Sequence, residues 1–269
     1  MILRWALPLA ALAALAGWLL ISPEGALGKL DAVGYAVCHR IDARSFHVAG
    51  RQLPMCARCS GEFSAAAIAL SFQAWRGGRA ARFPSRPIIF VLLAFLAAFA
   101  VDGLNSFMFL IAQTGASAPA VANLYTPSNT LRLLTGSGMG IALAALLFPA
   151  VNQTIWRDLP NRTALDAASF RALLLIVGAW DALILTEAPA VLYAAGVASA
   201  LGVLALLVSV FAMFWITLLR QENGFVLLRE LWLPACAGLT LALLLVVGID
   251  VVRFQMTGTW GGFPGLTGA

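Results

Sequence analysis

Apolar residues along this chain occur in long runs, and short segments containing Arg, Pro or Gly separate these runs. A run of about 20 such residues is long enough to cross the hydrocarbon core of a bilayer as an α-helix. Pro189 divides the longest apolar stretch, because proline rarely continues a helix. The pattern predicts about seven transmembrane helices, near residues 5–21, 61–75, 87–104, 130–149, 172–187, 190–219 and 230–252.

The composition narrows the class of protein. The chain has 269 residues, of which 61% are hydrophobic and 11% are charged, and its mean hydropathy is +0.91. Soluble domains carry about 25% charged residues, so a soluble enzyme, a disordered tail and a disulfide-rich secreted mini-domain are all excluded. The sequence therefore predicts an all-α polytopic membrane bundle in which residues 1–269 form a single transmembrane domain. The first run also resembles a signal peptide, and we interpret it as an anchor.

Basic residues indicate the orientation in the membrane. The isoelectric point near 9.5 would suggest nucleic acid in a soluble chain, but the Arg residues here lie in short loops, so we expect no nucleic-acid partner. Ten of the 17 basic residues fall on the side of the N-terminus and seven on the other side. The positive-inside rule then predicts a multi-pass protein of the inner (cytoplasmic) membrane with a cytoplasmic N-terminus. Five of the seven lie within residues 22–60, which favours the inverted alternative.

With this topology, charged residues gather at the outer ends of the predicted helices. Charges inside a membrane are costly, so they are usually paired and often functional. Residues 22–60 reach the same side, and we expect this segment to fold over the bundle as an extramembrane cap. The charged residues that fall at this end are Glu62, Asp102, Arg132, Glu187, Asp250 and Arg253.

The cap segment contains three of the four cysteines and both histidines of the chain, all within residues 38–59. Thiolate and imidazole are the ligands of zinc and other soft divalent metals, and a Cys-x-x-Cys turn can present two sulfurs to one ion. His39 adjoins a cysteine and would need unusual geometry to share its metal, so it is a candidate for acid–base catalysis together with Asp102. The predicted metal ligands are Cys38, His47, Cys56 and Cys59.

Two other interpretations of the cysteines stay open at this point. On an oxidising face, two of the three would form a structural disulfide. Alternatively, Arg58 between Cys56 and Cys59 would favour a thiolate, as in a redox-active Cys-x-x-Cys motif. Cys236 is distant in sequence and is most simply a small buried apolar residue.

Arginines near the cysteines suggest a site for an anion. Guanidinium groups bind phosphate and carboxylate through paired hydrogen bonds, as a lipid headgroup would require. Ser128 or Asn129 is expected to cap the helix near 130–149 and to direct its positive end toward the polar region. The predicted anion-binding residues are Arg40, Arg44, Asn129 and Arg132. The alternative is that these arginines neutralise the nearby carboxylates.

At these residues the chain resembles a family of bacterial and archaeal polytopic membrane proteins known as domain of unknown function 2085. The resemblance covers about residues 33–145, and the helices from about 172 to 252 lie beyond it. It implies a membrane protein and no particular activity. Ser60 stands where the family usually has Thr, which keeps the hydroxyl. The motifs are Cys38-His39-Arg40, Arg44-Ser45-Phe46, Pro54-x-Cys56-Ala57-Arg58-Cys59-x-Gly61, Asp102-Gly103 and Ser128-Asn129-x-Leu131-Arg132-x-x-Thr135-Gly136.

Two functions follow as hypotheses. The first is a membrane-embedded enzyme or binding protein with a Cys/His metal centre that acts on a lipid or another amphiphile. The second is an accessory subunit of a larger respiratory or photosynthetic complex, with other membrane subunits as partners and the cysteines as a structural clasp. Gly136 and Gly140 support the second hypothesis, because small residues four apart allow close helix packing. Transport is a weaker third hypothesis, since paired broken helices are absent.

Overall fold

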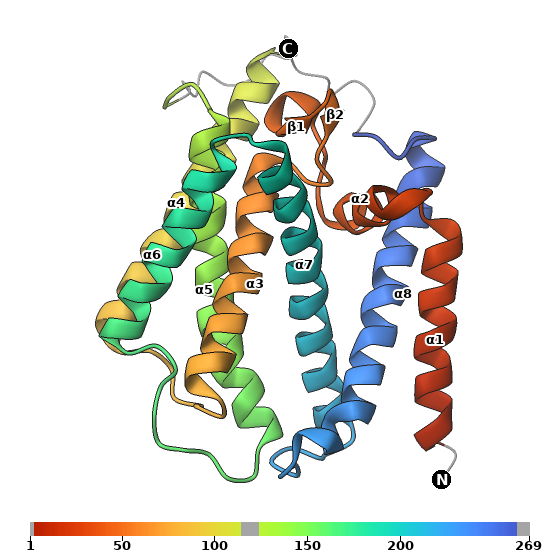
Figure 1. The fold of residues 1–269 in the computed structure, drawn as a ribbon, viewed down its shortest axis with the longest axis vertical. Helices are drawn as coiled ribbons and strands as arrows, with labels where there is room; N and C mark the ends of the chain where they lie inside the picture. Colours follow the sequence, from red (N-terminus) through yellow and green to blue (C-terminus); the bar gives the residue numbers. More distant parts are fainter. Residues whose placement is uncertain (1–2, 114–123, 263–269) are drawn as a thin grey trace.

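The structure is a computed structural model that describes residues 3–113 and 124–262 (Figure 1). Its described part is an all-α bundle with one short hairpin, as the sequence predicts. In chain order, the elements are α1 (Leu3–Ile21), α2 (Gly25–Val37), a 3-10 turn (Asp42–Arg44), β1 (His47–Val48), β2 (Arg51–Gln52), α3 (Ala57–Gly77), α4 (Arg86–Gln113), α5 (Asn129–Ile155), α6 (Ala167–Ile184), α7 (Pro189–Leu218), a second 3-10 turn (Leu228–Leu231) and α8 (Trp232–Thr257).

Every predicted apolar run lies in a helix apart from at most three residues at one end, and the break at Pro189 separates α6 from α7. Five of the described helices are long and apolar enough to cross a membrane, and the bent pair α1 and α2 makes up to six. The predicted number of about seven is therefore not confirmed as such. The difference is α3, whose Ser, Gln, Glu and Arg residues make it less apolar than these five helices.

The position of α3 explains its polar composition. It runs through the middle of the bundle, with α5 and α7 packed along it (Figure 1). A Cβ atom at Gly136 or Gly140 of α5 would overlap the backbone of α3, and one at Gly202 of α7 would do the same. These glycines allow close helix contact, and the neighbours shield α3 from lipid, so its side chains need not be apolar. Gly136 and Gly140 pack against α3 of the same chain. They therefore no longer support the hypothesis of an accessory subunit.

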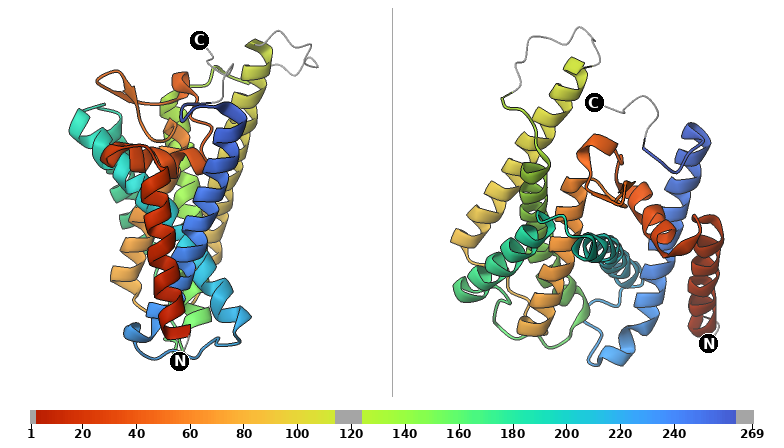
Figure 2. Two further views of the ribbon diagram at one scale, coloured as in Figure 1. Left: turned by 90° about the vertical axis from the view of Figure 1, so that its right-hand side faces the viewer. Right: turned by 45° about the horizontal axis from the view of Figure 1, so that its top comes forward.

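The cap segment lies across one end of the bundle. The axes of α1 and α2 differ by 107°, and α2 runs across the ends of the long helices (Figures 1 and 2). The Lys29 ammonium holds this bend by donating to the carbonyl of Ser22 at 3.0 Å, at the end of α1. After α2, the antiparallel hairpin pairs His47 with Gln52 around Ala49 and Gly50, which both have positive φ. The hairpin then leads directly into α3.

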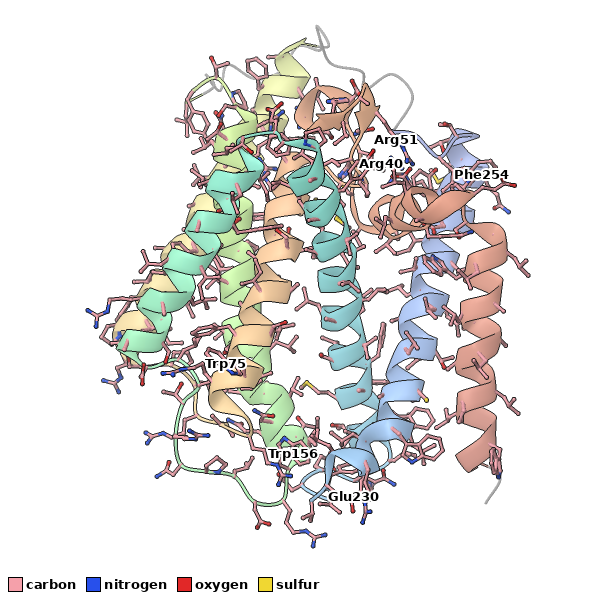
Figure 3. All side chains as sticks on the ribbon, viewed as in Figure 1. Arg40, Arg51, Trp75, Trp156, Glu230 and Phe254 are labelled. Atoms are coloured by element: carbon pink, nitrogen blue, oxygen red, sulfur yellow. The ribbon has the colours of Figure 1, made fainter. Side chains whose placement is uncertain are left out.

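Figure 3 shows how polar residues divide between the two ends of the bundle. Trp75, Trp156 and Glu230 lie at the end where the α3–α4, α5–α6 and α7–α8 connections occur, whereas Arg40 and Arg51 lie at the cap end. The α5 N-terminus also lies at the cap end. Its cap is Ser128, whose hydroxyl accepts from the Leu131 N–H at 3.2 Å, as expected for one of the two predicted cap residues.

Candidate metal and anion site

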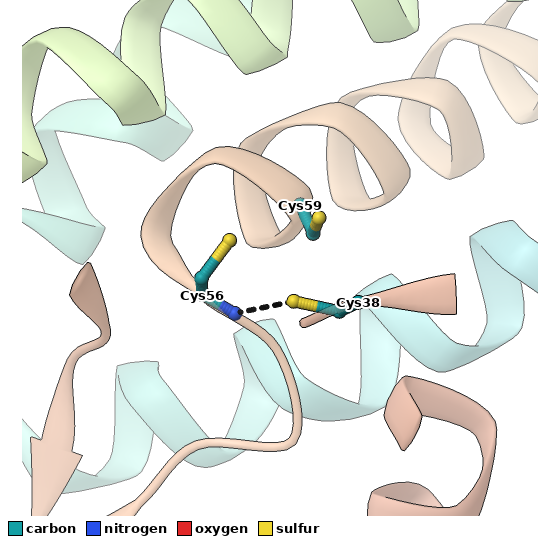
Figure 4. A group of neighbouring side chains, drawn as sticks. All are labelled: Cys38, Cys56 and Cys59. Atoms are coloured by element: carbon teal, nitrogen blue, oxygen red, sulfur yellow. Dashed lines mark hydrogen bonds between the residues drawn. The ribbon is translucent and has the colours of Figure 1, made fainter. Parts of the chain in front are cut away.

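The cysteines of the cap segment converge from three points of the chain. Cys38 ends α2, Cys56 is the residue before α3, and Cys59 lies in the first turn of α3 (Figure 4). Their sulfur atoms all lie within 4.8 Å of one another. In a tetrahedral zinc site, Zn–S bonds of about 2.3 Å place two sulfurs roughly 3.8 Å apart. This cysteine cluster, Cys38, Cys56 and Cys59, could therefore hold a metal ion.

Two backbone N–H groups donate to the sulfur of Cys38. Its sulfur accepts from the N–H of Cys56 at 3.3 Å and from the N–H of Arg40 at 3.4 Å. The positive φ of Arg40, 53°, turns the chain so that its N–H faces back toward this sulfur. Such N–H···S contacts stabilise negative charge on sulfur. All four cysteines of the chain lie in the described part and are free thiols there.

The three thiols titrate as a unit because they are close together and buried. The hydrogen bond to Cys56, together with burial, raises the pKa of Cys38 to about 12. The pKa of Cys56 falls well below its usual value, because the neighbouring thiols donate to it and Arg58 lies nearby. A divalent ion would supply the positive charge that several thiolates require.

The structure places His47 outside the cysteine cluster. It lies on β1, and its Nε2 forms a hydrogen bond of 2.9 Å with the carboxylate of Asp42. Both side chains are largely at the surface, with 35% and 67% of their areas exposed. His39, in contrast, is next to Cys38 and lines the same cavity as the cysteines. His47 pairs with Gln52 in the hairpin, and it is not among the residues that line the cavity.

A cavity of about 500 Å³ opens beside the cysteine cluster. We call it the arginine cavity, because it is bounded by the three cysteines, by His39 and Glu62, and by Arg40, Arg44, Arg58 and Arg132. Its remaining wall is apolar and comes mainly from α4, through Phe99, Phe107 and Leu110. The cavity thus combines soft metal ligands, positive charge and an apolar side.

Two of the four arginines are neutralised by buried carboxylates. Arg58 pairs with Asp102 of α4, which is 1% exposed and also accepts from Tyr125. Arg40 donates to Asp31 of α2 at 3.1 Å, and Arg51 donates to the other oxygen of the same carboxylate at 2.6 Å. Asp102, the predicted acid–base partner, does not line the cavity. It fixes the guanidinium that lies between two cysteines.

The other two arginines of the cavity have no ion-pair partner within the described residues. Arg44 donates to the carbonyl of Ser106 at 3.0 Å, and Arg132 donates to the side chain of Asn129 at 2.9 Å. Arg132 is only 6% exposed, yet its buried Nε has no hydrogen-bond partner. An uncompensated buried guanidinium is costly, so this arrangement is suited to a bound anion. Asn129 orients Arg132, which is how it contributes to the predicted anion site.

The sequence placed Arg253 of α8 at the cap end but did not predict its contact with the cysteine segment. The Arg253 guanidinium donates to the backbone carbonyls of Cys38 and His39 and lies 3.9 Å from the centre of the Tyr35 ring. It therefore holds the segment that carries the first cysteine. Only the tertiary fold reveals these contacts, because the partners are more than 200 residues apart.

Comparison with known proteins identifies the region that contains this site. The family model described as Predicted membrane protein (DUF2085) matches residues 38–146. The resemblance deduced from the motifs is therefore confirmed, and it is to a membrane-protein family of unknown function. The match includes every charged residue of the arginine cavity, whereas α6, α7 and α8 lie outside it. No curated protein and no solved structure matches the chain.

Proposed function

We propose that this membrane protein binds a soft divalent metal ion, zinc in the first instance, through Cys38, Cys56 and Cys59, and holds an anionic ligand beside it. The observation that carries the proposal is the position of the cysteine cluster in the wall of the arginine cavity. Three sulfurs close enough to share one ion adjoin two arginines that lack carboxylate partners. The negative charge of the thiolates and the positive charge of the two arginines compensate each other.

The number of protein ligands supports a reactive site. Structural zinc sites have four protein ligands, whereas catalytic sites have three and leave one position open for water or substrate. Three thiolates around a divalent cation carry one net negative charge, and the nearby Arg44 and Arg132 offset it. A metal in this position would act as a Lewis acid toward a ligand in the cavity. His39 lines the cavity and is the residue that we propose to move a proton there.

The first test is metal content. Protein purified in mild detergent is expected to contain about one zinc ion per chain. Replacing Cys59 with serine should remove most of that zinc, because the hydroxyl is a far weaker ligand than thiolate. Cys236→Ser is the matched control, since Cys236 is a free cysteine of α8 outside the cluster, and it should keep the wild-type zinc content. Elemental analysis measures both.

Thiol counting separates this proposal from a disulfide. After denaturation with a chelator and without reductant, four reactive thiols per chain are expected, in keeping with the four free cysteines. Metal-free protein in which a pair of thiols is missing would contradict the proposal and favour a structural disulfide. Equal zinc loss in the Cys59→Ser and Cys236→Ser proteins would also contradict it, because the loss would then not depend on the cluster.

We propose further that the cap end faces away from the cytoplasm. The loops at the opposite end contain most of the arginines, including Arg79, Arg82 and Arg162. The positive-inside rule places such loops in the cytoplasm. A fluorescent protein that folds only in the cytoplasm, fused after Ala269, should therefore stay dark, whereas the same protein fused before Met1 should fluoresce. The reverse result would show that the cap faces the cytoplasm.

A further inference from the structure

A second hollow shares part of its wall with the arginine cavity. It has a volume of about 620 Å³ and lies between the C-terminal end of α2 and one face of α8. We call it the α8 groove. Val37, Cys38 and His39 line both the groove and the cavity, so the cysteine segment is shared between them. The α8 wall consists of Leu244, Leu245, Gly248, Ile249, Val252 and Met256, with Arg253 beside the shared segment.

The α8 groove is apolar and faces the membrane. It is part of a helix that can span a bilayer, and its rim residues Leu244, Val252 and Met256 are each more than half exposed. From residue 244 to residue 256 an α-helix rises about 18 Å. The hydrocarbon core of a bilayer is about 30 Å thick, so this length corresponds to roughly the depth of one leaflet. One acyl chain of a lipid has this reach.

Together, the arginine cavity and the α8 groove provide one charged region and one apolar region, which are the two parts of an amphiphile. Arg44 and Arg132, which have no ion-pair partner within the described residues, offer positive charge at one end, and the groove offers an apolar surface at the other. A membrane lipid brings an anionic headgroup and an acyl chain in the same order. A soluble anion would use only the cavity, and an apolar partner helix would leave the two arginines of the cavity without an anion.

We infer that the anionic ligand of this site is a membrane lipid, with its headgroup in the arginine cavity and one acyl chain in the α8 groove. This inference rests on the anion site of the proposed function and adds the class of ligand. The lipid enters laterally from the bilayer, because the groove faces the hydrocarbon. Its headgroup then lies next to the cysteine cluster.

Gly248 offers a sharp test of the groove. It lines the hollow, and a Cβ atom built there meets no other atom within 4 Å, so a larger side chain can occupy the groove without disturbing the backbone. Gly248→Leu is expected to weaken binding of phosphatidylglycerol about tenfold, which corresponds to displacing roughly two buried methylene groups. Native mass spectrometry of the zinc-loaded protein in detergent, titrated with dioleoyl phosphatidylglycerol, measures this. Zinc content and binding of inorganic phosphate should stay unchanged.

Gly178→Leu is the matched control. Gly178 is also an exposed glycine in a membrane-spanning helix with nothing within 4 Å of its Cβ position, but it lies on α6, away from the groove. This variant should bind phosphatidylglycerol like the wild type. A measurement on the unmodified protein adds to the test: dihexanoyl phosphatidylglycerol, with the same headgroup and short chains, should bind more weakly than the dioleoyl lipid.

The outcomes separate the two proposals. If Gly248→Leu and the short-chain lipid both bind like their references while phosphate still binds, the acyl-chain inference is overturned and the anion site stands. If phosphatidylglycerol and zwitterionic phosphatidylcholine bind equally, and Arg132→Gln changes neither, the headgroup assignment fails. If neither phosphate nor zinc binds, the proposed function itself fails.

Discussion

Replacing Asp102 with alanine is expected to lower the free energy of unfolding by about 3–5 kcal/mol, the usual loss when one partner of a buried ion pair is removed. Asp102 is 1% exposed, and its carboxylate compensates Arg58, whose side chain is 17% exposed. The same carboxylate accepts from the Tyr125 hydroxyl at 2.8 Å. Without it, a guanidinium remains at the edge of the bilayer with no counter-charge. Unfolding of the detergent-solubilised protein, followed by circular dichroism, measures the difference.

Asp42→Ala supplies the comparison for this variant. Asp42 also pairs with a basic partner, His47, but it is 67% exposed, and exposed pairs contribute about 0–1 kcal/mol. A much larger loss of stability is therefore expected for Asp102→Ala than for Asp42→Ala. Equal losses would show that the Asp102 network does not stabilise the bundle.

Replacement of Asp102 is also expected to change anion binding in the arginine cavity. Arg58 lies between Cys56 and Cys59 in sequence, and its guanidinium is held by the carboxylate and by the Ser106 hydroxyl at 3.1 Å. Freed from Asp102, this guanidinium is expected to turn into the arginine cavity and to add a positive charge there. Asp102→Asn keeps the shape of the side chain and should retain more stability than Asp102→Ala. Both should bind inorganic phosphate at least as well as the wild type does.

The sequence predicts much of this architecture because its dominant signal is simple. Long apolar runs stop at Arg, Pro or Gly, and each run lies mostly in a helix of the structure. The helix α2 was missed because Lys29, Asp31 and three glycines interrupt its apolar residues. Its stability comes from tertiary contacts, including Asp31 with Arg40 and Arg51, and no local periodicity reports such contacts.

The candidate site was also predicted only in part: local spacing indicated some of its residues, and the rest depend on the tertiary fold. The spacing of Cys56 and Cys59 identified two of the clustered sulfurs, since one helical turn places both on one side. Spacing could not reveal that His39 lines the cavity with the cysteines whereas His47 pairs with Asp42, because both positions depend on the tertiary fold. The sequence did not predict the α8 groove, because an apolar residue of α8 can face either lipid or a hollow.

Replacing Gly140 with alanine is expected to destabilise the bundle by about 3 kcal/mol or more, at or above the upper end of the range for overpacked cores. The added methyl group would overlap the carbonyl oxygen of Glu62, which is a backbone atom of α3. No side-chain rotation can relieve this overlap, so α3 and α5 must move apart. Gly178→Ala, with open space around its Cβ position, is expected to leave stability unchanged or to raise it slightly, because alanine favours helix. Equilibrium unfolding in detergent compares the two variants.

The separation of α3 and α5 should also affect the site, because the two helices hold its two halves. Cys59 lies at the start of α3, and Arg132 lies in the first turn of α5. Gly136 lies one helical turn before Gly140, and it already packs closely against the backbone of Arg58. A shift of α5 at Gly140 should therefore affect both the cysteine cluster and the anion-binding arginines. Gly140→Ala protein that remains folded should therefore bind phosphate more weakly while keeping its zinc, since Cys56 and Cys59 both belong to the start of α3 and α5 contributes no cysteine. Loss of zinc with unchanged phosphate binding would show that α5 holds the cysteine cluster rather than the anion site.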